Sequence, residues 1–173
     1  MIRDVHWTIV ATSLGPVVVG ASAAGVCWLS FERDARRFAA HFVGTPLIED
    51  GARINALAAE VAAAIETPSP AMLEIPLDIA GTPFQQRVWR AVRAIPCGET
   101  RSYAALAKAL DKPAASRAIG GANAANRIAV LIPCHRVIAA DGTLGGYAWG
   151  LEIKAELLRR EGARADPPQP PLL

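Results

Sequence analysis

The stretch "GTPFQQRVWRAVRAIPCGETRSYAALA", residues 81–107, contains the strongest local structural signals in this chain of 173 residues. Thr82 has a side chain suited to capping a helix, and Pro83 favours the first helical position. Apolar residues then recur at helical spacing along one face: Phe84, Val88 and Val92. Because Ile95–Pro96 ends this pattern, the stretch predicts an amphipathic helix that begins at residue 83.

Two shorter helices around a turn are predicted next. Ser102 can cap a helix that runs through Leu110, residues 111–113 ("DKP") form a turn, and "AASRAIGGANAA" at 114–125 forms the second helix. Two short helices about a tight turn are typical of the helix-turn-helix, whose second helix enters a DNA groove. The pattern does not define the crossing angle. An amphipathic helix at 150–163 is expected to close this part of the chain.

The chain before residue 80 has a different pattern. Glycines at 15 and 25 separate short apolar runs that favour β-strands, and alanine-rich segments further on favour helices. We expect strands at 6–13, 16–22 and 26–31, helices at 35–42 (capped by Asp34) and 52–66, and an extended segment at 72–79. The two parts together predict an α+β protein.

No residue between Asp4 and Glu32 is charged, which imitates a targeting or membrane segment. Gly15–Pro16 breaks this stretch, and serine and threonine interrupt it more often than a spanning helix allows. We therefore expect strands here and no membrane association.

Charge is distributed unevenly along the chain. The net charge is only +2, but residues 83–136 contain 9 Lys/Arg and 2 Asp/Glu, which gives +7. A local excess of this size is typical of a surface that binds a polyanion such as DNA. A solvated helical surface would explain the charge equally well, so charge alone leaves both interpretations open.

The stretch "LIPCHRVIA", residues 131–139, places His135 and Arg136 directly after Cys134. The three cysteines are widely spaced and form no C-x-x-C pair, which argues against zinc and against a disulfide framework and favours a reducing compartment. Cys27 is expected to be a buried strand residue. A base and a cation could promote a thiolate at Cys134, whereas Cys97 is followed by Gly98 and Glu99. Adjacent residues need not point the same way, so an inert buried thiol stays possible at this stage.

The segments before and after Cys134 favour a role for this cysteine as a nucleophile. "GANAANR" at 121–127 and "DGTLGGYAWG" at 141–150 are loops that can bring backbone close to a flat ligand, and the second supplies two aromatic rings. A reactive thiol beside aromatic rings, joined to a basic helical pair, suggests covalent chemistry on a base in DNA.

Three stretches, 81–107, 116–138 and 145–162, resemble the O6-alkylguanine-DNA alkyltransferases, also called methylated-DNA–protein-cysteine methyltransferases. The likeness is strongest to the C-terminal half of the bacterial Ada protein and is thin before residue 81. The resemblance implies that Cys134 accepts the alkyl group, that His135 deprotonates it through a water, and that Glu161 orients this histidine. Asn126 would hold the active-site loop.

The resemblance also implies roles in binding the substrate. Tyr103 would assist rotation of the base and donate to the guanine ring, the backbone of Cys134 and Val137 would read the amino group, and the amide of Ala148 would read O6. Tyr147 and Trp149 would form the wall of the alkyl pocket. Arg117 would fill the gap left by a flipped base. Further DNA contacts are expected from three side chains: Ser102, Lys112 and Gln85.

We therefore expect a ribonuclease-H-like α/β domain at 1–77, a helical domain with a winged-helix-like helix-turn-helix at 78–164, and a disordered tail at 165–173. The expected activity is single-turnover transfer of alkyl groups to Cys134 from O6-alkylguanine, mainly O6-methylguanine, and from O4-methylthymine in double-stranded DNA. No cofactor or metal is expected, and the protein is expected to be a cytoplasmic, nucleoid-associated bacterial monomer. The alternatives are a non-catalytic protein that binds alkyl lesions and a cysteine hydrolase.

Overall fold

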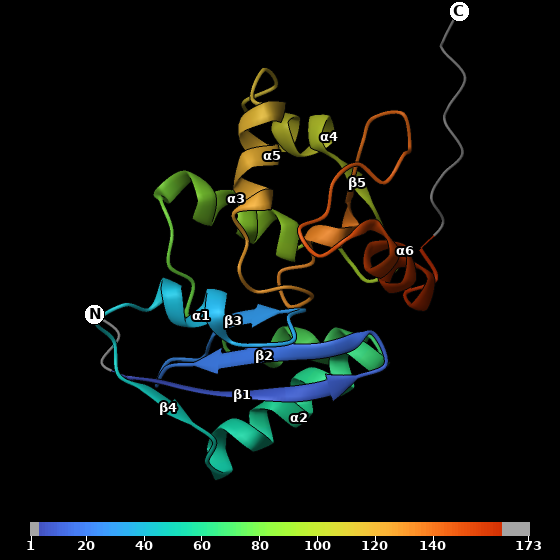
Figure 1. The fold of residues 1–173 in the computed structure, drawn as a ribbon. Helices are drawn as coiled ribbons and strands as arrows, with labels where there is room; N and C mark the ends of the chain where they lie inside the picture. The colour runs from blue at the N-terminus through green and yellow to red at the C-terminus, as the bar shows by residue number, and fades with distance from the viewer. Residues whose placement is uncertain (1–3, 164–173) are drawn as a thin grey trace, which may run out of the picture. The chain divides into compact units, whose positions relative to one another are not determined.

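A computed structural model describes residues 4–163 and divides the chain into two units (Figure 1). The first unit contains the chain up to Ala80 together with Arg127–Leu131, and the second contains Gly81–Asn126 and the chain from Ile132 onward. A mixed sheet with separate helices confirms the predicted α+β class. The predicted division after residue 77 did not include the return of 127–131 to the first unit. The tail expected at 165–173 lies outside the described residues.

The first unit is built on a four-stranded sheet with the order β3-β2-β1-β4. β1 (Val5–Thr12), β2 (Gly15–Ala21) and β3 (Val26–Ser30) form the predicted antiparallel meander, and β4 (Leu47–Glu49) pairs parallel to β1. Gly15, with φ of 109°, makes the tight β1–β2 turn. β4 was not predicted, because three residues are too few to show the alternation of apolar and polar side chains that indicates a strand.

Two helices pack on opposite faces of this sheet (Figure 1). α2 (Ala52–Glu66) has the predicted limits, and its buried residues follow helical spacing: Ile54, Ala58, Val61 and Ile65. α1 (Arg36–His41) is shorter than expected, and it contributes Phe38 to an aromatic cluster with Trp28. Asp34 accepts a hydrogen bond from the Arg36 amide at 3.0 Å.

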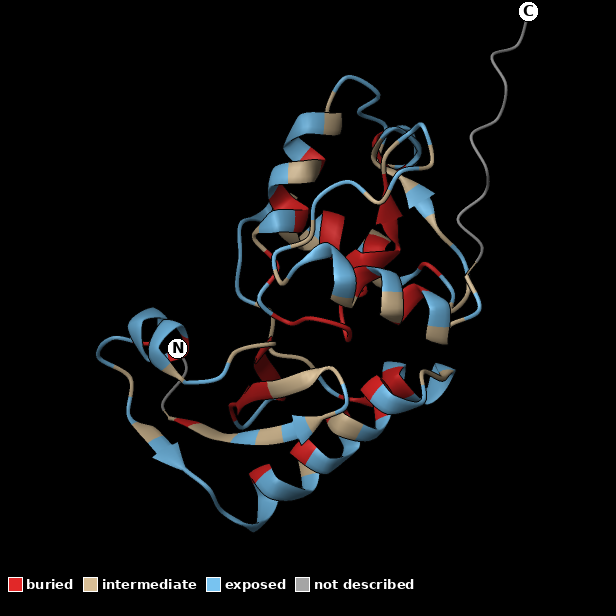
Figure 2. Ribbon diagram, turned by 45° about the vertical axis from the view of Figure 1, so that its right-hand side comes forward, coloured by how far each residue is buried: buried red, intermediate tan, exposed pale blue. Residues whose placement is uncertain are grey.

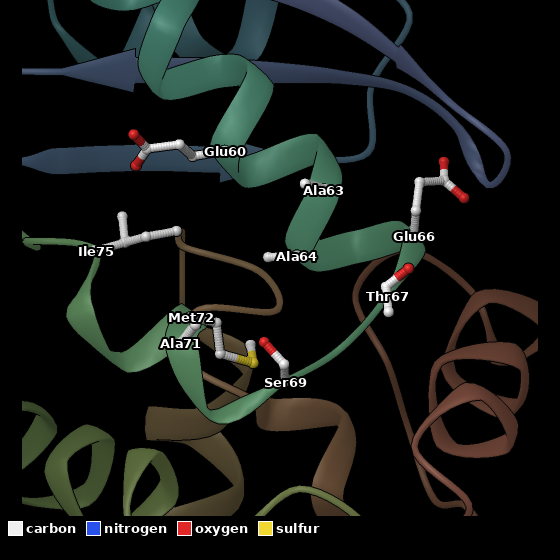
Figure 3. A pocket seen from close by; sticks show the side chains of 9 residues that line it. All are labelled: Glu60, Ala63, Ala64, Glu66, Thr67, Ser69, Ala71, Met72 and Ile75. Carbon is white, nitrogen blue, oxygen red and sulfur yellow. The ribbon is translucent and has the colours of Figure 1, made fainter.

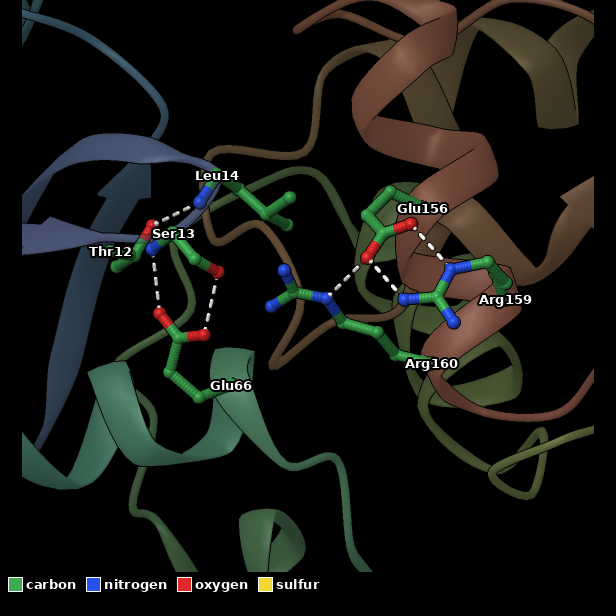
Figure 4. A network of polar contacts seen from close by, with 7 residues as sticks. All are labelled: Thr12, Ser13, Leu14, Glu66, Glu156, Arg159 and Arg160. Atoms are coloured by element: carbon green, nitrogen blue, oxygen red, sulfur yellow. Dashed lines mark hydrogen bonds and ion pairs between the residues drawn. The ribbon is translucent and has the colours of Figure 1, made fainter.

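The β1–β2 turn is attached to the end of α2. Glu66 accepts hydrogen bonds from the backbone amide of Ser13 at 2.7 Å and from its hydroxyl at 2.6 Å (Figure 4). A cavity of about 560 Å³ lies between the end of α2 and the 3₁₀ helix η1 (Pro70–Glu74), as Figure 3 shows. The prediction of an extended chain from residue 72 was wrong for residues 72–74, because Pro70 starts a helical turn that buries Met72.

Residues 127–131 form the edge of the first unit. The amide of Leu29 donates to the carbonyl of Arg127, and the amide of Ala129 donates to the carbonyl of Leu29, both at 2.8 Å. This pairing is a single parallel bridge between Leu29 and Ile128, and the chain turns directly after it at Val130, which has φ of 64°.

The second unit begins with the predicted capped helix, α3 (Pro83–Arg93). The Thr82 hydroxyl accepts from the Gln85 amide at 3.2 Å, and the Gln85 side chain accepts from the Thr82 amide at 2.9 Å. This reciprocal capping box begins the helix, whose buried residues are Val88, Trp89 and Val92. Figure 2 shows in red where buried residues occur along the chain.

The predicted helix pair is α4 (Tyr103–Ala109) and α5 (Ser116–Ala124), which pack against each other, and α3 packs against α5. α6 (Leu151–Arg160) is the last described helix. Between α5 and α6 the chain forms a 3₁₀ turn, η2 (Cys134–Arg136), and a short strand, β6 (Val137–Ile138), which pairs parallel to β5 (Arg101–Ser102). Among residues 4–163, no helix is both long and apolar enough to cross a membrane.

Candidate active site

Cys134 is the first residue of η2 and is only 3% exposed. Its amide donates to the carbonyl of Ile132 at 2.7 Å, and the amide of Arg136 donates to the carbonyl of Pro133 at 2.9 Å. These two short-range bonds form a tight turn. The turn fixes the backbone on both sides of the thiol.

Asn126, just after α5, ties this turn to the helix-turn-helix. Its amide nitrogen Nδ2 donates to the carbonyl of Ile132 at 3.0 Å and to Cys134 Sγ at 3.2 Å. Asn123, one turn earlier, donates to the carbonyl of Cys134 at 3.4 Å. Both asparagines are buried, so one helix end positions the thiol and the backbone beside it.

His135 and Arg136 share one carboxylate, that of Glu161 at the end of α6. His135 Nε2 lies 2.7 Å from Glu161 Oε1, and Arg136 reaches Oε1 at 2.8 Å and Oε2 at 2.9 Å. The Arg136 guanidinium also donates to the carbonyl of Ile95 at 2.6 Å. The Glu161 and His135 side chains are completely buried, so this is a desolvated network in which each charge has a partner.

The network determines the protonation states. Burial alone would raise the pKa of Glu161, but the hydrogen bonds and charges of His135 and Arg136 lower it to about 2. Burial lowers the pKa of His135, although Glu161 acts in the opposite direction. We therefore assign a neutral ring that donates from Nε2, because a carboxylate can only accept. Nδ1 is then the unprotonated nitrogen, and it is buried with no hydrogen-bond partner among residues 4–163.

The cation whose charge lowers the pKa of the Cys134 thiol is Lys154, not Arg136. Burial raises the pKa of the Cys134 thiol to about 11, while the Asn126 hydrogen bond and the charge of Lys154 lower it. Arg136 does not promote the thiolate as the sequence suggested, because its guanidinium is bound to Glu161 and Ile95. For Cys97, burial and the negative charge of Glu161 both raise the pKa.

Cys27 is buried on β3, as predicted, and burial followed by the charge of Asp78 raises its pKa to about 12. Of the three thiols, Cys134 is the one that has a hydrogen-bond donor and a cation assigned to it. The surroundings of the three thiols therefore support the sequence-based choice of Cys134 over Cys97 as the reactive cysteine.

Cys134 opens onto a cavity of about 300 Å³. The lining includes Tyr103 from α4, Asn123 from α5, and Gly146, Tyr147 and Ala148 from the loop before α6. The Tyr147 hydroxyl is buried and has no hydrogen-bond partner among the described residues. A mostly enclosed cavity with a thiol, two phenols and a few backbone groups suits a flat, partly polar ligand. The cavity in Figure 3 is lined by aliphatic, carboxylate and hydroxyl groups and has no such nucleophile.

Two residues predicted to bind substrate do not line this cavity. The Trp149 ring packs edge-on against Tyr147, with centroids 5.2 Å apart and planes at 70°. Trp149 therefore contacts a residue of the cavity wall but does not line the cavity itself. Val137 is fully buried, and its carbonyl accepts a hydrogen bond from Lys154.

The predicted DNA-binding residues lie in different settings. Arg117 is exposed near the start of α5, and Lys112 is exposed in the turn before it. Ser102 caps α4 as predicted, and its hydroxyl accepts from the Ala105 amide at 3.0 Å. The carboxamide oxygen of Gln85 closes the capping box of α3, so this group has a structural role that the prediction of a DNA contact did not consider.

Sequence reasoning missed Lys154. It is 0% exposed, and its ammonium contacts only backbone carbonyls. The signal was present, because Lys154 stands three and four residues before Leu157 and Leu158, on the face that α6 buries. Among residues 4–163, no three side chains that could ligate a metal come together.

Comparison with known proteins defines the family. Residues 83–163 match the family described as "6-O-methylguanine DNA methyltransferase, DNA binding domain". The crystal structure of Mycobacterium tuberculosis OGT in complex with DNA matches with a TM-score of 0.78 and 35% identity, over 91% of this chain and 92% of that chain. The chain therefore belongs to the O6-alkylguanine-DNA alkyltransferase family, the methylated-DNA–protein-cysteine methyltransferases.

Curated relatives match over about half of the chain. The Escherichia coli bifunctional transcriptional activator/DNA repair enzyme Ada is 63% identical over 89 residues, which are 51% of this chain and 25% of Ada. The Mycobacterium tuberculosis methylated-DNA–protein-cysteine methyltransferase is 52% identical over 92 residues, 53% of this chain and 56% of that protein. The matched region thus spans between a quarter and just over half the length of these two relatives.

We predict that Glu161→Gln lowers the free energy of unfolding at pH 7 by about 3 kcal/mol, because the buried Arg136 loses the carboxylate that it contacts at 2.8 Å. The pKa of Glu161 is about 2 in the folded protein, below an unfolded value of about 4.3. Its stabilising contribution is therefore present above pH of about 4 and is lost as the pH falls toward 2. The free energies of unfolding of the variant and the wild type, measured with denaturant, should therefore converge as the pH falls from about 4 toward 2.

Glu156→Gln is the matched control. Glu156 accepts from Arg159 and Arg160 at 2.7 and 2.9 Å on the surface of α6 (Figure 4). Removing its charge should change stability little, because exposed pairs are screened by solvent. Equal losses in the two variants would contradict the role assigned to the buried network.

Proposed function

We propose that this protein repairs DNA by transferring the methyl group of O6-methylguanine to its own Cys134. The observation that carries the proposal is a buried thiol at the base of a cavity, held by Asn126 and followed by a neutral histidine with a free ring nitrogen. Family membership supports the same conclusion, since relatives are named methylated-DNA–protein-cysteine methyltransferases. The OGT relative was crystallised in complex with DNA.

The proposed reaction is a displacement at the methyl carbon. The Cys134 thiolate attacks this carbon, a sulfur–carbon bond forms, and the carbon–O6 bond breaks with its electron pair kept by the base. The base then takes up one proton, and the protein keeps the methyl group as a thioether. Water does not hydrolyse a thioether back to a thiol, so each molecule acts once. This reaction requires no cofactor.

His135 is the proposed base for the thiol proton, acting through a water from Nδ1. Its partner Glu161 fixes the tautomer through the 2.7 Å contact at Nε2 and stabilises the charged ring after proton transfer. Asn126 holds Sγ toward the cavity. This arrangement resembles the triads that activate cysteine in other enzymes.

The proposed substrate position is the cavity next to Cys134. A guanine that lies inside a duplex stack must be extruded to reach this thiol, which costs a few kcal/mol. Tyr103 and Ala148 line this cavity; Tyr103 would donate to the base, and the amide of Ala148 would bind O6. O4-methylthymine, a smaller base, is the proposed second substrate.

The proposed DNA surface is α5 with the turn before it. Arg117 is exposed on the second residue of α5 and would fill the space left by the extruded base. The net charge of +7 between residues 83 and 136 supports binding to the phosphate backbone. Activity as a monomer and a cytoplasmic location stay predictions.

The identity of the methyl acceptor is tested by replacing Cys134 and, as the matched control, Cys97 with serine. Cys134→Ser should abolish transfer of a labelled methyl group from duplex DNA to the protein while DNA binding persists, because serine lacks an easily ionised group. Cys97→Ser should retain nearly all transfer, since Cys97 is not among the residues that line the cavity next to Cys134. Retained transfer in Cys134→Ser would contradict the proposal. Binding of methylated DNA by the wild type without transfer would favour the non-catalytic alternative.

We further predict that Arg117→Ala slows methyl transfer from duplex DNA by about tenfold or more but leaves the reaction with free O6-methylguanine nearly unchanged. Only the duplex needs a side chain in the place of the extruded base. Rates on the two substrates, measured at saturating concentration, give the comparison. Lys108→Ala, an exposed cation on α4, is the control and should leave the ratio of the two rates unaltered. Equal slowing of Arg117→Ala on both substrates would exclude the proposed role.

A further inference from the structure

We propose that Asn123 is a specificity-determining residue whose carboxamide accepts the exocyclic amino group of guanine and makes O6-alkylguanine a better substrate than O4-alkylthymine. This inference rests on the proposed function, because it concerns the base that enters the cavity next to Cys134. It adds a side-chain acceptor to a cavity in which backbone groups were expected to recognise the amino group.

The first observation is the setting of the Asn123 carboxamide. Asn123 lies in the last turn of α5, is 8% exposed, and lines the cavity together with Tyr103 and Cys134. Its Nδ2 donates to the carbonyl of Cys134 at 3.4 Å. Because a carbonyl can only accept, this contact defines which end of the carboxamide is the nitrogen. The other end, Oδ1, is buried and has no hydrogen-bond partner among residues 4–163.

The neighbouring phenol does not supply the missing donor. Burial raises the pKa of Tyr103, and a side-chain hydrogen bond with Asn123 acts in the opposite direction. A hydrogen bond lowers the pKa of a phenol when the phenol oxygen accepts it, since such a bond favours the phenolate. Asn123 is therefore the donor in this contact, through Nδ2. The Tyr103 proton stays available for a base in the cavity, and Oδ1 stays without a donor.

The backbone carbonyls that were expected to recognise the amino group already accept hydrogen bonds within the protein. The carbonyl of Val137 accepts from Lys154 at 2.6 Å, and Val137 does not line the cavity. The carbonyl of Cys134 accepts from Asn123. Of these three acceptors, Asn123 Oδ1 is the one that has no donor in the described part of the chain. A buried acceptor without a partner is unfavourable, so a ligand that brings a donor to it is favoured over one that does not.

The two proposed bases differ in the donors that they carry. Alkylation at O6 removes the hydrogen from N1 of guanine, so the 2-amino group is the only N–H donor left on this base in DNA. Alkylation at O4 removes the hydrogen from N3 of thymine and leaves a base with no N–H donor. Only the alkylated guanine can therefore pair with Oδ1. The 3.4 Å contact from Nδ2 to Cys134 is long for a hydrogen bond, so a small rotation of the carboxamide toward the base costs little.

The test compares duplexes that carry O6-methylguanine, O6-methylhypoxanthine or O4-methylthymine at the same position. O6-methylhypoxanthine is O6-methylguanine without the 2-amino group, so this pair isolates the contact in question. Methyl transfer to the protein is timed with protein in excess for the wild type, Asn123→Leu and Asn123→Ala. Leucine has nearly the shape of asparagine but no polar side-chain atom. Asn55→Leu makes the same substitution at an exposed position of α2 and is the control. Circular dichroism verifies the fold of each variant.

We expect the ratio of the rates on O6-methylguanine and O6-methylhypoxanthine to fall by about tenfold or more in Asn123→Leu relative to the wild type, because the variant has no acceptor for the amino group. The ratio of the rates on O6-methylguanine and O4-methylthymine should fall in the same way. The cost of extruding each base is the same for both proteins, so it cancels from this comparison. Asn55→Leu should keep the wild-type ratios.

Unchanged ratios in Asn123→Leu would overturn the proposal even if all rates fall, because a purely structural role of Asn123 slows the three bases alike. Asn123→Ala decides if Asn123→Leu does not fold. If neither variant folds, the wild type is compared on single-stranded DNA, where neither base is paired: equal rates on O6-methylguanine and O6-methylhypoxanthine would overturn the proposal, and a preference of about tenfold or more for the first would support it. Absence of transfer from O6-methylguanine to the wild type would refute the proposed function, whereas transfer with unchanged ratios would refute only the role of Asn123.

Discussion

The arrangement of the active site depends on one buried carboxylate. Glu161 is shared by His135 and Arg136, and neither the carboxylate nor the imidazole has contact with solvent. A carboxylate is stable in such a place only if nearby donors replace its water. Glu161 thereby connects the end of α6 to η2, and through Arg136 it connects both to the carbonyl of Ile95 after α3. Three separate segments are held together by this one charge.

The Glu161 carboxylate also determines which chemical roles are open to His135 and Arg136. Since Glu161 can only accept, His135 donates from Nε2 and keeps Nδ1 as a base. Since Arg136 is bound to Glu161, the cation whose charge lowers the pKa of the Cys134 thiol is Lys154. Asn126 supplies the hydrogen bond at Sγ. The thiol is thus buried and hydrogen-bonded; burial raises its pKa, while the Asn126 hydrogen bond and the charge of Lys154 act in the opposite direction.

Local signals predicted the parts of the structure that local forces determine. The limits of α2 and the capped start of α3 follow from alanine content, a threonine cap and a proline at the first position, and they were confirmed. Strands β4, β5 and β6 were missed, because their two or three residues are ordered by partners distant in sequence. Adjacency in sequence suggested that Arg136 acts on Cys134, but tertiary packing turns it toward Glu161. Lys154 was missed for the same reason: its carbonyl partners are defined by a loop whose path no sequence pattern specifies. Of the positions taken from the family resemblance, Tyr103, Tyr147 and Ala148 line the cavity, whereas Val137 and Trp149 do not.

The central claim is that one thiol, Cys134, takes one methyl group and retains it. The most direct measurement is the intact mass of the protein after incubation with an excess of duplex DNA that contains O6-methylguanine, followed by peptide mapping. The account predicts an increase of one methyl group per molecule, located on the Cys134 peptide and stable on prolonged incubation, with demethylated DNA formed in equal amount. Demethylation of DNA in excess over protein, or a methyl group found on Cys27 or Cys97, would contradict it.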